Sequence, residues 1–307
     1  MKIYFVSEPG KLVRKDGGLA FVSKDGKVDY LANMYDVIVI ANSKVSITSA
    51  AMRLLGRYNV ELVVLEWNGE PSIRASAPVP NKTAETRLKQ YEAIIKNKAL
   101  IYARPIIIRK IIEQGRALRK IAKAKRVKWL REQSYEVEAL AQEASKANDP
   151  DSLRAVEARA AKLYWGLISN LFEGFPGREH DSQDPYNQAL NYAYGMLYAS
   201  CDKALEITGL DPYAGFFHTM KSGKRSLTFD FSEQFKPLVD TAIFLKLKPE
   251  KVSVDANGLS YSSRKEIAQV VGEVLESCDK VILAEAWSLA SSLRKGEPYV
   301  PGWKACT

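Results

Sequence analysis

The chain has 307 residues, of which 46% are hydrophobic and 26% are charged. This composition excludes a disordered, a collagen-like and a coiled-coil protein, and the length predicts about two globular domains. The three cysteines are widely spaced and form no CxxC pair, so we expect a reducing compartment and no structural zinc site. Because only two histidines are present, the sequence excludes a multi-histidine metal site.

No segment has the character of a targeting or membrane-spanning sequence. The apolar run at the N-terminus stops at Glu8 and is too short for a signal peptide. The longest uncharged stretch, Pro185 to Cys201, falls short of the ~20 apolar residues that a membrane helix requires. We therefore expect a soluble, cytoplasmic protein without a membrane partner.

The first part of the chain, up to residue 75, is predicted to be rich in strands. Residues 37–40 and 61–65 are β-branched apolar runs typical of buried strands, and residues 46–58 between them have apolar side chains at helical spacing. Residues 67–70 have the composition of a tight hairpin turn. Further strands are expected at residues 2–6, 18–22 and 27–31.

Helices are predicted after the stiff segment at residues 78–80. Two of them begin at Asp149-Pro150 and Asp184-Pro185, where the aspartate is the N-cap and the proline takes the first helical position. Asp211-Pro212 opens a short segment in the same way. The expected helices cover residues 87–102, 105–124, 127–146, 149–172, 184–208, 262–278 and 280–294, with another one after residue 227.

Strands followed by helices indicate an α+β chain with two domains. We predict a small, mostly β, sandwich-like domain at residues 1–77 and a larger all-α domain, which holds the active site, at residues 78–307. A unit as small as the first has limited stability alone, so packing against a second copy or against the helices would stabilise it.

Positive charge is concentrated between Lys82 and Arg131. This segment has 16 lysines and arginines but only 3 glutamates, which gives +13, whereas the rest of the chain has −4 of the net +9. A solvated helical face is the ordinary explanation of such a run. Because few acids lie in the same helices, we expect that i,i+4 pairing does not neutralise the charge, which favours nucleic acid as a partner.

Glu157 lies within the apolar stripe of the predicted helix 149–172, four residues after Leu153 and three before Ala160. A carboxylate on a buried face must be protonated, paired with a cation or bound to a metal, because burying its charge alone is costly. An internal ion pair with a basic residue of another helix is the commoner outcome. The sequence leaves the ion pair and the metal site open.

His218 and two acids form a second group of candidate ligands. Asp230 and Glu233 are three residues apart, so both carboxylates share one face if this segment is helical. Structural alternatives are a core position for His218 and a favourable helix-dipole interaction for the acids. Two carboxylates and an imidazole suit Mg²⁺ or Mn²⁺, which can stabilise charge on a phosphodiester and activate an attacking hydroxyl.

Four segments, taken in order, resemble one known family. The first contains Glu157 in Val-Glu-Ala-Arg-Ala-Ala, and the others are residues 184–192, 209–218 and 226–240. Together they resemble the CRISPR-associated adaptation integrases, the larger of the two proteins that capture new spacers. The resemblance covers the whole chain, and the order of a β region before a helical region is similar as well.

The resemblance implies roles for individual residues. Glu157, His218 and Glu233 match the divalent-metal ligands of the family, and Asp230 matches an accompanying acid that ligates or orients. Where the family usually reads Phe-Arg-Pro, this sequence has Lys236, so the bidentate contact of an arginine is lost there. DNA contacts are assigned to three basic residues, Arg87, Lys224 and Arg225.

The activity that the resemblance implies is that of a metal-dependent DNA integrase and endonuclease. A 3′-hydroxyl of captured DNA attacks a phosphodiester of the repeat array, with Mg²⁺ or Mn²⁺ as the cofactor and no covalent protein–DNA intermediate. The implied partners are double-stranded and branched DNA, a second copy of this chain in a homodimer, and a small ferredoxin-like adaptation protein. Two integrase dimers flank one dimer of that partner.

Two alternatives remain on the sequence alone. A non-catalytic basic nucleic-acid-binding protein would explain the charged segment, but not Glu157 on an apolar face together with His218 and the two later acids. A covalent phosphotyrosine mechanism is also open on composition, although tyrosines at helical spacing more often pack in cores or grooves. The tyrosines concerned are Tyr164, Tyr192, Tyr194 and Tyr198.

Overall fold

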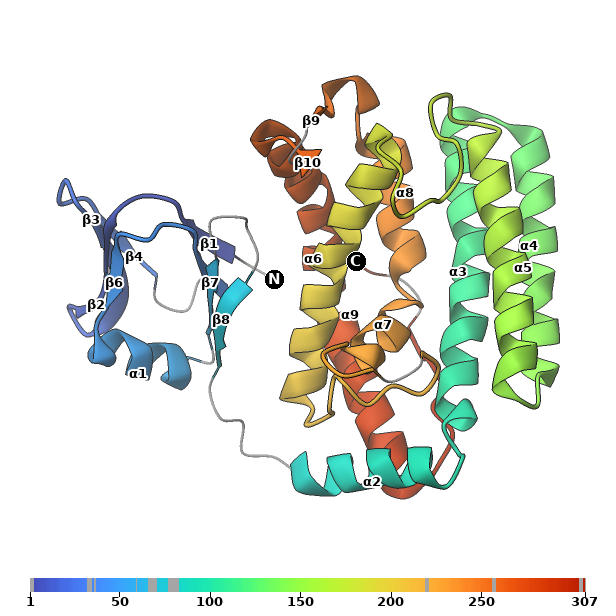
Figure 1. Cartoon of the computed structure of the whole chain (residues 1–307), viewed down its shortest axis with the longest axis horizontal. Helices are drawn as coiled ribbons and strands as arrows, with labels where there is room; N and C mark the ends of the chain where they lie inside the picture. Colours follow the sequence, from blue (N-terminus) through green and yellow to red (C-terminus); the bar gives the residue numbers. More distant parts are fainter. Residues whose placement is uncertain are drawn as a thin grey trace. The chain divides into compact units, whose positions relative to one another are not determined.

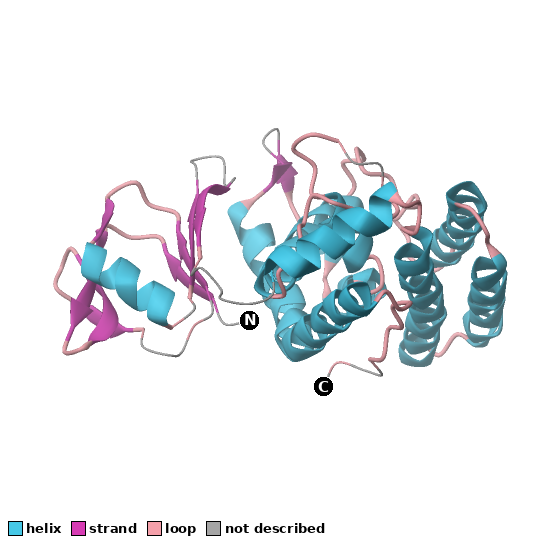
Figure 2. Ribbon diagram, turned by 90° about the horizontal axis from the view of Figure 1, so that it is seen from below, coloured by secondary structure: helices cyan, strands magenta, loops and turns pink. Residues whose placement is uncertain are grey.

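The computed structural model divides into two compact units, Met1–Pro80 and Asn81–Thr307 (Figure 1). The first unit is rich in strands and the second consists mostly of helices (Figure 2), which confirms the predicted α+β class. The structure describes residues 3–31, 35, 37–58, 60–65, 71–76, 83–218, 221–255, 258–303 and 306. Among these residues, no helix has both the length and the apolar character needed to cross a membrane.

Two four-stranded sheets make up the described part of the first unit, with strand orders β1-β5-β7-β8 and β4-β3-β2-β6. In the first sheet β1, β5 and β7 run parallel, with Ile3 opposite Val37 and Val37 opposite Glu61, and β8 pairs with β7 antiparallel. The strands are β1 (Ile3–Val6), β2 (Gly10–Lys15), β3 (Gly18–Ser23), β4 (Val28–Tyr30), β5 (Val37–Ile40), β6 (Val45–Ile47), β7 (Glu61–Leu65) and β8 (Pro71–Ala75).

One hydrophobic core joins both sheets to helix α1 (Ser49–Arg57). Leu12 and Leu19 of one sheet, Ile38 of the other and Leu54 of the helix belong to the same buried cluster. This is the sandwich-like arrangement that we predicted. The sequence did not reveal β2, β6 or β8, because β2 buries only one side chain and the other two are short or begin with proline. The predicted turn at residues 67–70 lies outside the described residues.

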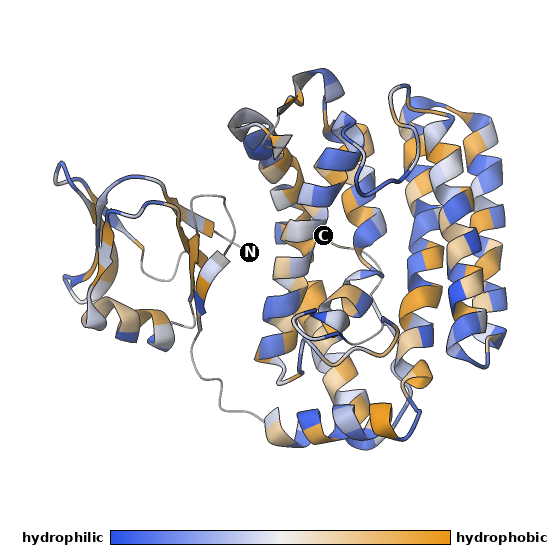
Figure 3. Ribbon diagram, viewed as in Figure 1, coloured by the Kyte–Doolittle hydropathy of each residue, from blue (hydrophilic) through white to orange (hydrophobic). Residues whose placement is uncertain are grey.

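The second unit is built on long amphipathic helices, which carry polar and apolar residues side by side in Figure 3. A single buried cluster extends from Ala93 to Trp303 and holds these helices together. The helices are α2 (Thr83–Ile95), α3 (Leu100–Lys125), α4 (Lys128–Lys146), α5 (Pro150–Ser169), α6 (Pro185–Ile207), α7 (Ser226–Ser232), α8 (Lys236–Lys246) and α9 (Tyr261–Lys295). A short 3₁₀ turn η1 (Pro249–Lys251) and the two-stranded ribbon β9 (Val254–Asp255) and β10 (Gly258–Leu259) precede α9.

The two Asp-Pro helix starts are confirmed. Asp149 accepts hydrogen bonds from the backbone of Asp151 and Ser152 at the start of α5, and Asp184 accepts one from Asn187 at the start of α6. Such caps satisfy backbone groups that the first helical turn leaves without partners. The third pair, Asp211-Pro212, opens a turn rather than a helix.

Two predicted helix boundaries are wrong. The expected helix 87–102 is interrupted between α2 and α3, where Asn97 adopts a left-handed backbone with φ 56°. The expected helices 262–278 and 280–294 form one continuous helix, α9, because no glycine or proline separates them.

A disulfide joins Cys278 of α9 to Cys306, whereas Cys201 is a buried thiol. This pair differs from the reduced cysteines that we expected from the sequence. The two residues are 28 positions apart, and the C-terminal segment brings them together by returning along α9. Spacing alone does not reveal such a pairing.

Candidate active site

Asp230 of α7 organises the segment that carries His218. Its carboxylate accepts hydrogen bonds from the backbone N–H groups of Phe216, Phe217 and His218 at 2.6, 2.9 and 2.9 Å. The same carboxylate lies 2.5 Å from Nδ1 of the His218 ring. This hydrogen bond raises the pKa of His218, and because it is made through Nδ1, Nε2 is the ring nitrogen that Asp230 does not contact. A carboxylate behind the ring is typical of metal-binding histidines.

The segment before His218 is held from two sides. Gln90 of α2 donates from Nε2 to the carbonyl oxygens of Asp211 and Ala214 at 2.9 and 2.7 Å, and its Oε1 accepts from the Asp211 N–H at 2.9 Å. Gly215 allows the close approach of α7, because a Cβ there would lie 2.7 Å from the Cβ of Ser226 and 2.8 Å from Oδ2 of Asp230. These contacts fix the backbone that presents His218.

Glu157 and Glu233 meet at one cation, the ammonium of Lys110 on α3. Lys110 Nζ lies 2.5 Å from Oε1 of Glu157 and 2.6 Å from Oε2 of Glu233. The second oxygen of Glu233 lies 2.6 Å from Nζ of Lys236. The internal ion pair that the sequence left open for Glu157 is therefore present, with a lysine of another helix as its partner.

Charge and burial act in opposite directions on these groups. Burial alone lowers the pKa of Lys110, but the charges of Glu233 and Glu157 outweigh it and raise that pKa. Burial alone raises the pKa of Glu233, but Lys110 and Lys236 outweigh it and lower that pKa. Lys236 also lies over the rings of Tyr194 and Tyr198, at 5.1 and 5.6 Å from their centroids. These mutual charges therefore keep Glu233, Lys110 and Lys236 ionised.

The predicted ligands form two groups. Asp230 faces the backbone of residues 216–218, whereas Glu233 faces Lys110 and Lys236, so the two acids have different partners. Within the described ranges, no three or more His, Cys, Asp or Glu side chains are arranged to hold a metal ion. Glu157 and Glu233 thus share the ammonium of Lys110, whereas His218 is hydrogen-bonded to Asp230.

The chemistry of these donors fits a hard divalent ion. Two carboxylates already surround a positive charge, and an imidazole is oriented by a carboxylate behind it. The buried Oε2 of Glu233 accepts no hydrogen bond of regular geometry, although the Lys110 ammonium lies close to it. An oxygen in this situation can coordinate a metal ion.

A cavity of about 230 Å³ adjoins Lys110 and Lys236. Asp240 lies in its lining, where it accepts hydrogen bonds from the hydroxyls of Tyr164 and Tyr194 at 3.0 and 2.6 Å. Burial raises the pKa of Asp240 to about 7 and the pKa of both tyrosines well above their usual value. These two tyrosines therefore serve a buried hydrogen-bond network, which weakens the phosphotyrosine alternative for them.

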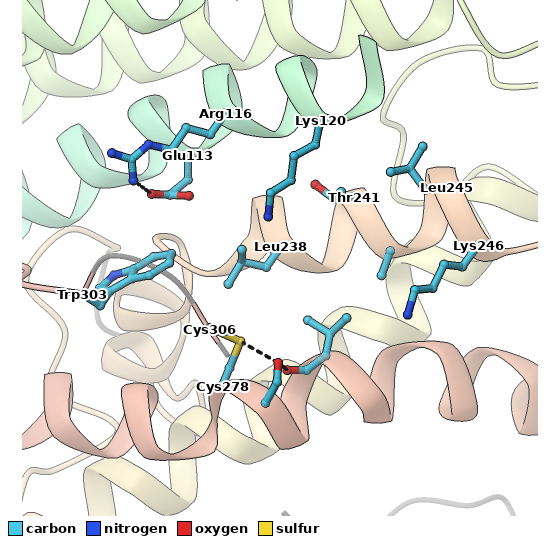
Figure 4. A pocket seen from close by; sticks show the side chains of 13 residues that line it. Glu113, Arg116, Lys120, Leu238, Thr241, Leu245, Lys246, Cys278, Trp303 and Cys306 are labelled. Carbon is cyan, nitrogen blue, oxygen red and sulfur yellow. Dashed lines mark hydrogen bonds and ion pairs between the residues drawn. A yellow bond between two sulfur atoms is a disulfide. The ribbon is translucent and has the colours of Figure 1, made fainter. Parts of the chain in front are cut away.

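A second cavity, of about 320 Å³, lies between α3, α8 and α9 and is lined by Glu113, Arg116 and Lys120 (Figure 4). The C-terminal segment closes one side through Trp303 and the disulfide-bonded Cys306. None of the predicted ligands lines this cavity.

The three residues assigned to DNA contacts have different surroundings. Arg87 and Lys224 are exposed. Arg225 forms ion pairs with Asp202 and Glu206, and its guanidinium lies 5.3 Å from the ring centroid of Tyr213. Their roles in DNA binding remain predictions.

Some cations of the basic segment form ion pairs within it. Glu92 pairs with Lys89 and Lys96, and Glu113 pairs with Arg109 and Arg116, so two of the three acids in the segment each contact two cations. Both acids are already counted in the net +13 of the segment, so these ion pairs leave that excess of positive charge in place.

At the end of α3 and the start of α4, Arg119 and Lys128 pair with Glu138 and Glu132, but the cations beside them lack such partners in the described part of the chain. Among the residues that the structure describes, no carboxylate pairs with Lys123, Arg126 or Arg131. These three residues line a cavity of about 470 Å³ together with Arg119 and Lys128. We call these five residues the basic corner.

The residues that sequence reasoning missed are Lys110 and Gln90. Lys110 is one of many cations in the basic segment, and nothing in its neighbourhood marks it as the partner of residues 47 and 123 positions away. Gln90 gives no signal either, because a glutamine in an amphipathic helix is ordinarily exposed. Their partners are defined only by the packing of α2 and α3.

Comparison with known proteins agrees with this picture. The family model of the CRISPR associated protein Cas1 matches residues 4–269. The CRISPR-associated endonuclease Cas1 of Hyperthermus butylicus is 32% identical, covering 98% of this chain and 98% of its own length. The CRISPR-associated endonuclease Cas1 2 of Pyrobaculum aerophilum is 33% identical, covering 96% of this chain and 98% of its own.

Solved structures share the fold. A casposase bound to integration product has a TM-score of 0.79 at 21% identity, covering 99% of this chain and 95% of its own. A Cas6-RT-Cas1–Cas2 complex has a TM-score of 0.71 at 17% identity, covering 98% of this chain and 36% of its own. From the family match and the full-length relatives, we conclude that this chain belongs to the CRISPR-associated Cas1 family.

Proposed function

We propose that this protein is a metal-dependent DNA integrase and endonuclease of CRISPR adaptation. One observation carries the proposal: Glu157 and Glu233 lie against a single cation, and the charge of Glu233 also acts on His218, whose ring is oriented by Asp230. Carboxylates in this setting suit a divalent ion, and such ions assist the transfer of phosphodiester bonds.

Glu157, Glu233 and Nε2 of His218 would hold Mg²⁺ or Mn²⁺. The ion, when bound, supplies positive charge to the phosphodiester that reacts and to the oxygen that departs. Asp230 acts as a positioning residue, because it fixes both the ring of His218 and the backbone before it. Gln90 supports the same backbone from α2.

The substrate in this proposal is DNA with a 3′-hydroxyl end, which attacks a phosphodiester of the repeat array. The basic corner offers a surface for the phosphates of double-stranded or branched DNA. The casposase with a similar fold is described as bound to integration product, which supports strand transfer. The two buried tyrosines with hydroxyls bonded to Asp240 favour direct transfer without a covalent intermediate.

The proposed partners are a second copy of this chain, paired through the strand-rich unit, and a small ferredoxin-like adaptation protein. A neighbour of similar fold is described as a Cas6-RT-Cas1–Cas2 complex, which supports a second Cas protein as partner. Light scattering of the full chain, alone and with DNA, measures the mass of the assembly. A monomeric mass under both conditions would contradict the dimer.

Replacing His218 by alanine tests the active site. We expect cleavage and strand transfer in Mg²⁺ or Mn²⁺ to fall by about 100-fold or more, the effect of losing a group that acts in the transition state. His180→Ala is the matched control, because His180 is the other histidine of the chain and its side chain is 81% exposed. Full activity of His218→Ala would contradict the assignment, and DNA binding without any metal-dependent activity of the wild type would favour the non-catalytic alternative.

A further inference from the structure

Lys110 holds an unusual place in the candidate active site. Its ammonium contacts one oxygen of Glu157 and one of Glu233, and its side chain is 12% exposed. Lys236 occupies the other oxygen of Glu233. Both oxygens of Glu233 are therefore engaged by lysines before any metal ion binds.

The ammonium and a divalent ion compete for the same oxygens. A small divalent ion binds carboxylate oxygens at about 2.0–2.2 Å, whereas the ammonium lies 2.5 and 2.6 Å from them. Two cations between the buried carboxylate of Glu233 and the half-buried one of Glu157 would repel each other, because a largely buried site screens charge poorly. Entry of the metal therefore requires the ammonium to move.

A destination for the ammonium lies one helical turn away. Gln114 follows Lys110 at i+4 on α3, so both side chains lie on the same face of this helix. Oε1 of Gln114 is buried and has no hydrogen-bond partner among the described residues. Both residues line the same cavity of about 230 Å³, which gives the flexible lysine side chain room to turn.

We propose that Lys110 is a resident counter-cation, which stands between Glu157 and Glu233 in the metal-free protein and moves to Gln114 when a divalent ion enters. The proposal rests on the proposed metal site and adds to it a cation exchange. Before the exchange, Lys110 stabilises two carboxylates that would otherwise repel each other. After the exchange, the unpaired oxygen of Gln114 receives a charge-assisted hydrogen bond.

Binding of Mn²⁺ to four proteins tests this exchange without any measurement of activity. The proteins are the wild type, Lys110→Met, Gln114→Leu and the double variant, and Mn²⁺ affinity is measured by calorimetry and by the loss of the free-ion paramagnetic resonance signal. We expect Lys110→Met to bind Mn²⁺ about tenfold more tightly, because the metal no longer displaces a charge-assisted hydrogen bond. Gln114→Leu should bind Mn²⁺ at least about threefold more weakly than the wild type, because the displaced ammonium of Lys110 has lost its hydrogen-bond acceptor.

The double variant tests whether the Lys110 ammonium moves to Gln114. With Lys110 absent, Gln114→Leu should change the affinity no further, so the two effects are not additive. Lys236→Met is the matched control, because Lys236 contacts Glu233 but not Glu157. An equal gain in affinity from both lysine variants would show a general effect of charge and would contradict the exchange.

Thermal unfolding adds a second measurement. In a chelator, Lys110→Met should melt below the wild type, and Mn²⁺ should raise its melting temperature by more than it raises that of the wild type. If Lys110→Met does not fold without metal, Gln114→Leu still tests the movement of Lys110 to Gln114, because this variant keeps both lysines. An affinity of Gln114→Leu for Mn²⁺ equal to that of the wild type would overturn this movement. Weaker Mn²⁺ binding by Lys110→Met would overturn the counter-cation role alone, whereas a wild type that binds no Mn²⁺ would overturn the proposed metal site itself.

Discussion

Asp230 and Asp240 are both buried, but their surroundings differ. Asp230 accepts hydrogen bonds from three consecutive backbone N–H groups and from the ring of His218. Among the described residues, the hydroxyls of Tyr164 and Tyr194 are the direct partners of Asp240. Burial consequently raises the pKa of Asp240 to about 7.

The raised pKa of Asp240 predicts a pH dependence of stability. An acid whose folded-state pKa lies above its unfolded value of about 3.9 weakens the fold as pH rises between the two values. Asp240→Asn removes this penalty, so its free energy of unfolding, relative to the wild type, should rise by up to ~4 kcal/mol between pH 4 and pH 7. Urea unfolding of both proteins across this range measures the difference.

Asp181→Asn is the control for this prediction, because the Asp181 side chain is 97% exposed. Its stability should differ from that of the wild type by the same small amount at every pH. A difference between Asp240→Asn and the wild type that stays constant from pH 4 to pH 7 would contradict the raised pKa of Asp240.

At the scale of single elements, the turn before α7 depends on Gly215. An alanine there would place its Cβ 2.7 Å from the Cβ of Ser226 and 2.8 Å from Oδ2 of Asp230. We expect Gly215→Ala to cost roughly 1–3 kcal/mol of unfolding free energy, as overpacked sites do, and to reduce activity by displacing His218. Urea unfolding and a strand-transfer assay measure the two effects.

Gly195→Ala is the matched control in α6, because a Cβ at Gly195 would meet no atom within 4 Å. Alanine is the better helix former, so this variant should be as stable as the wild type or up to ~1 kcal/mol more stable. Equal stability of the two alanine variants would contradict the close packing of the turn against α7.

The elements also show how far the sequence could predict this structure. Asp149 and Asp184 cap their helices as expected, because capping depends on a few adjacent residues. The break near Asn97 was not predicted, because it depends on how α2 and α3 pack. At the site, the sequence indicated Glu157, Glu233 and His218, but the lysine that joins the two glutamates comes from a contact over long sequence distance.

At the scale of the whole molecule, the basic corner predicts how DNA binding depends on salt. Each phosphate contact contributes about −0.9 to the slope of log K against log salt for duplex DNA. Replacing Lys123, Arg126 and Arg131 should weaken binding and make this slope shallower by about 2–3. Lys123→Gln and Arg131→Gln suit the helices, and Arg126→Asn suits its left-handed backbone at φ 58°.

Lys89→Gln with Lys96→Gln is the control for this prediction. Both lysines already pair with Glu92, so their replacement should change the slope by less than the three basic-corner substitutions. Fluorescence anisotropy of a labelled duplex, titrated at several salt concentrations, gives the slopes. An unchanged slope for the triple variant would place the DNA surface elsewhere on the molecule.

In the proposed reaction, a DNA 3′-hydroxyl attacks a phosphodiester directly at the site of Glu157, His218 and Glu233. A strand-transfer assay with two donor duplexes tests it most directly, one ending in a 3′-hydroxyl and the other in a 3′-dideoxynucleotide, each with repeat-containing target DNA and Mn²⁺. We predict joined product only from the hydroxyl donor and only without a chelator. Joined product from the dideoxy donor, or a covalent protein–DNA adduct on a denaturing gel, would contradict the account.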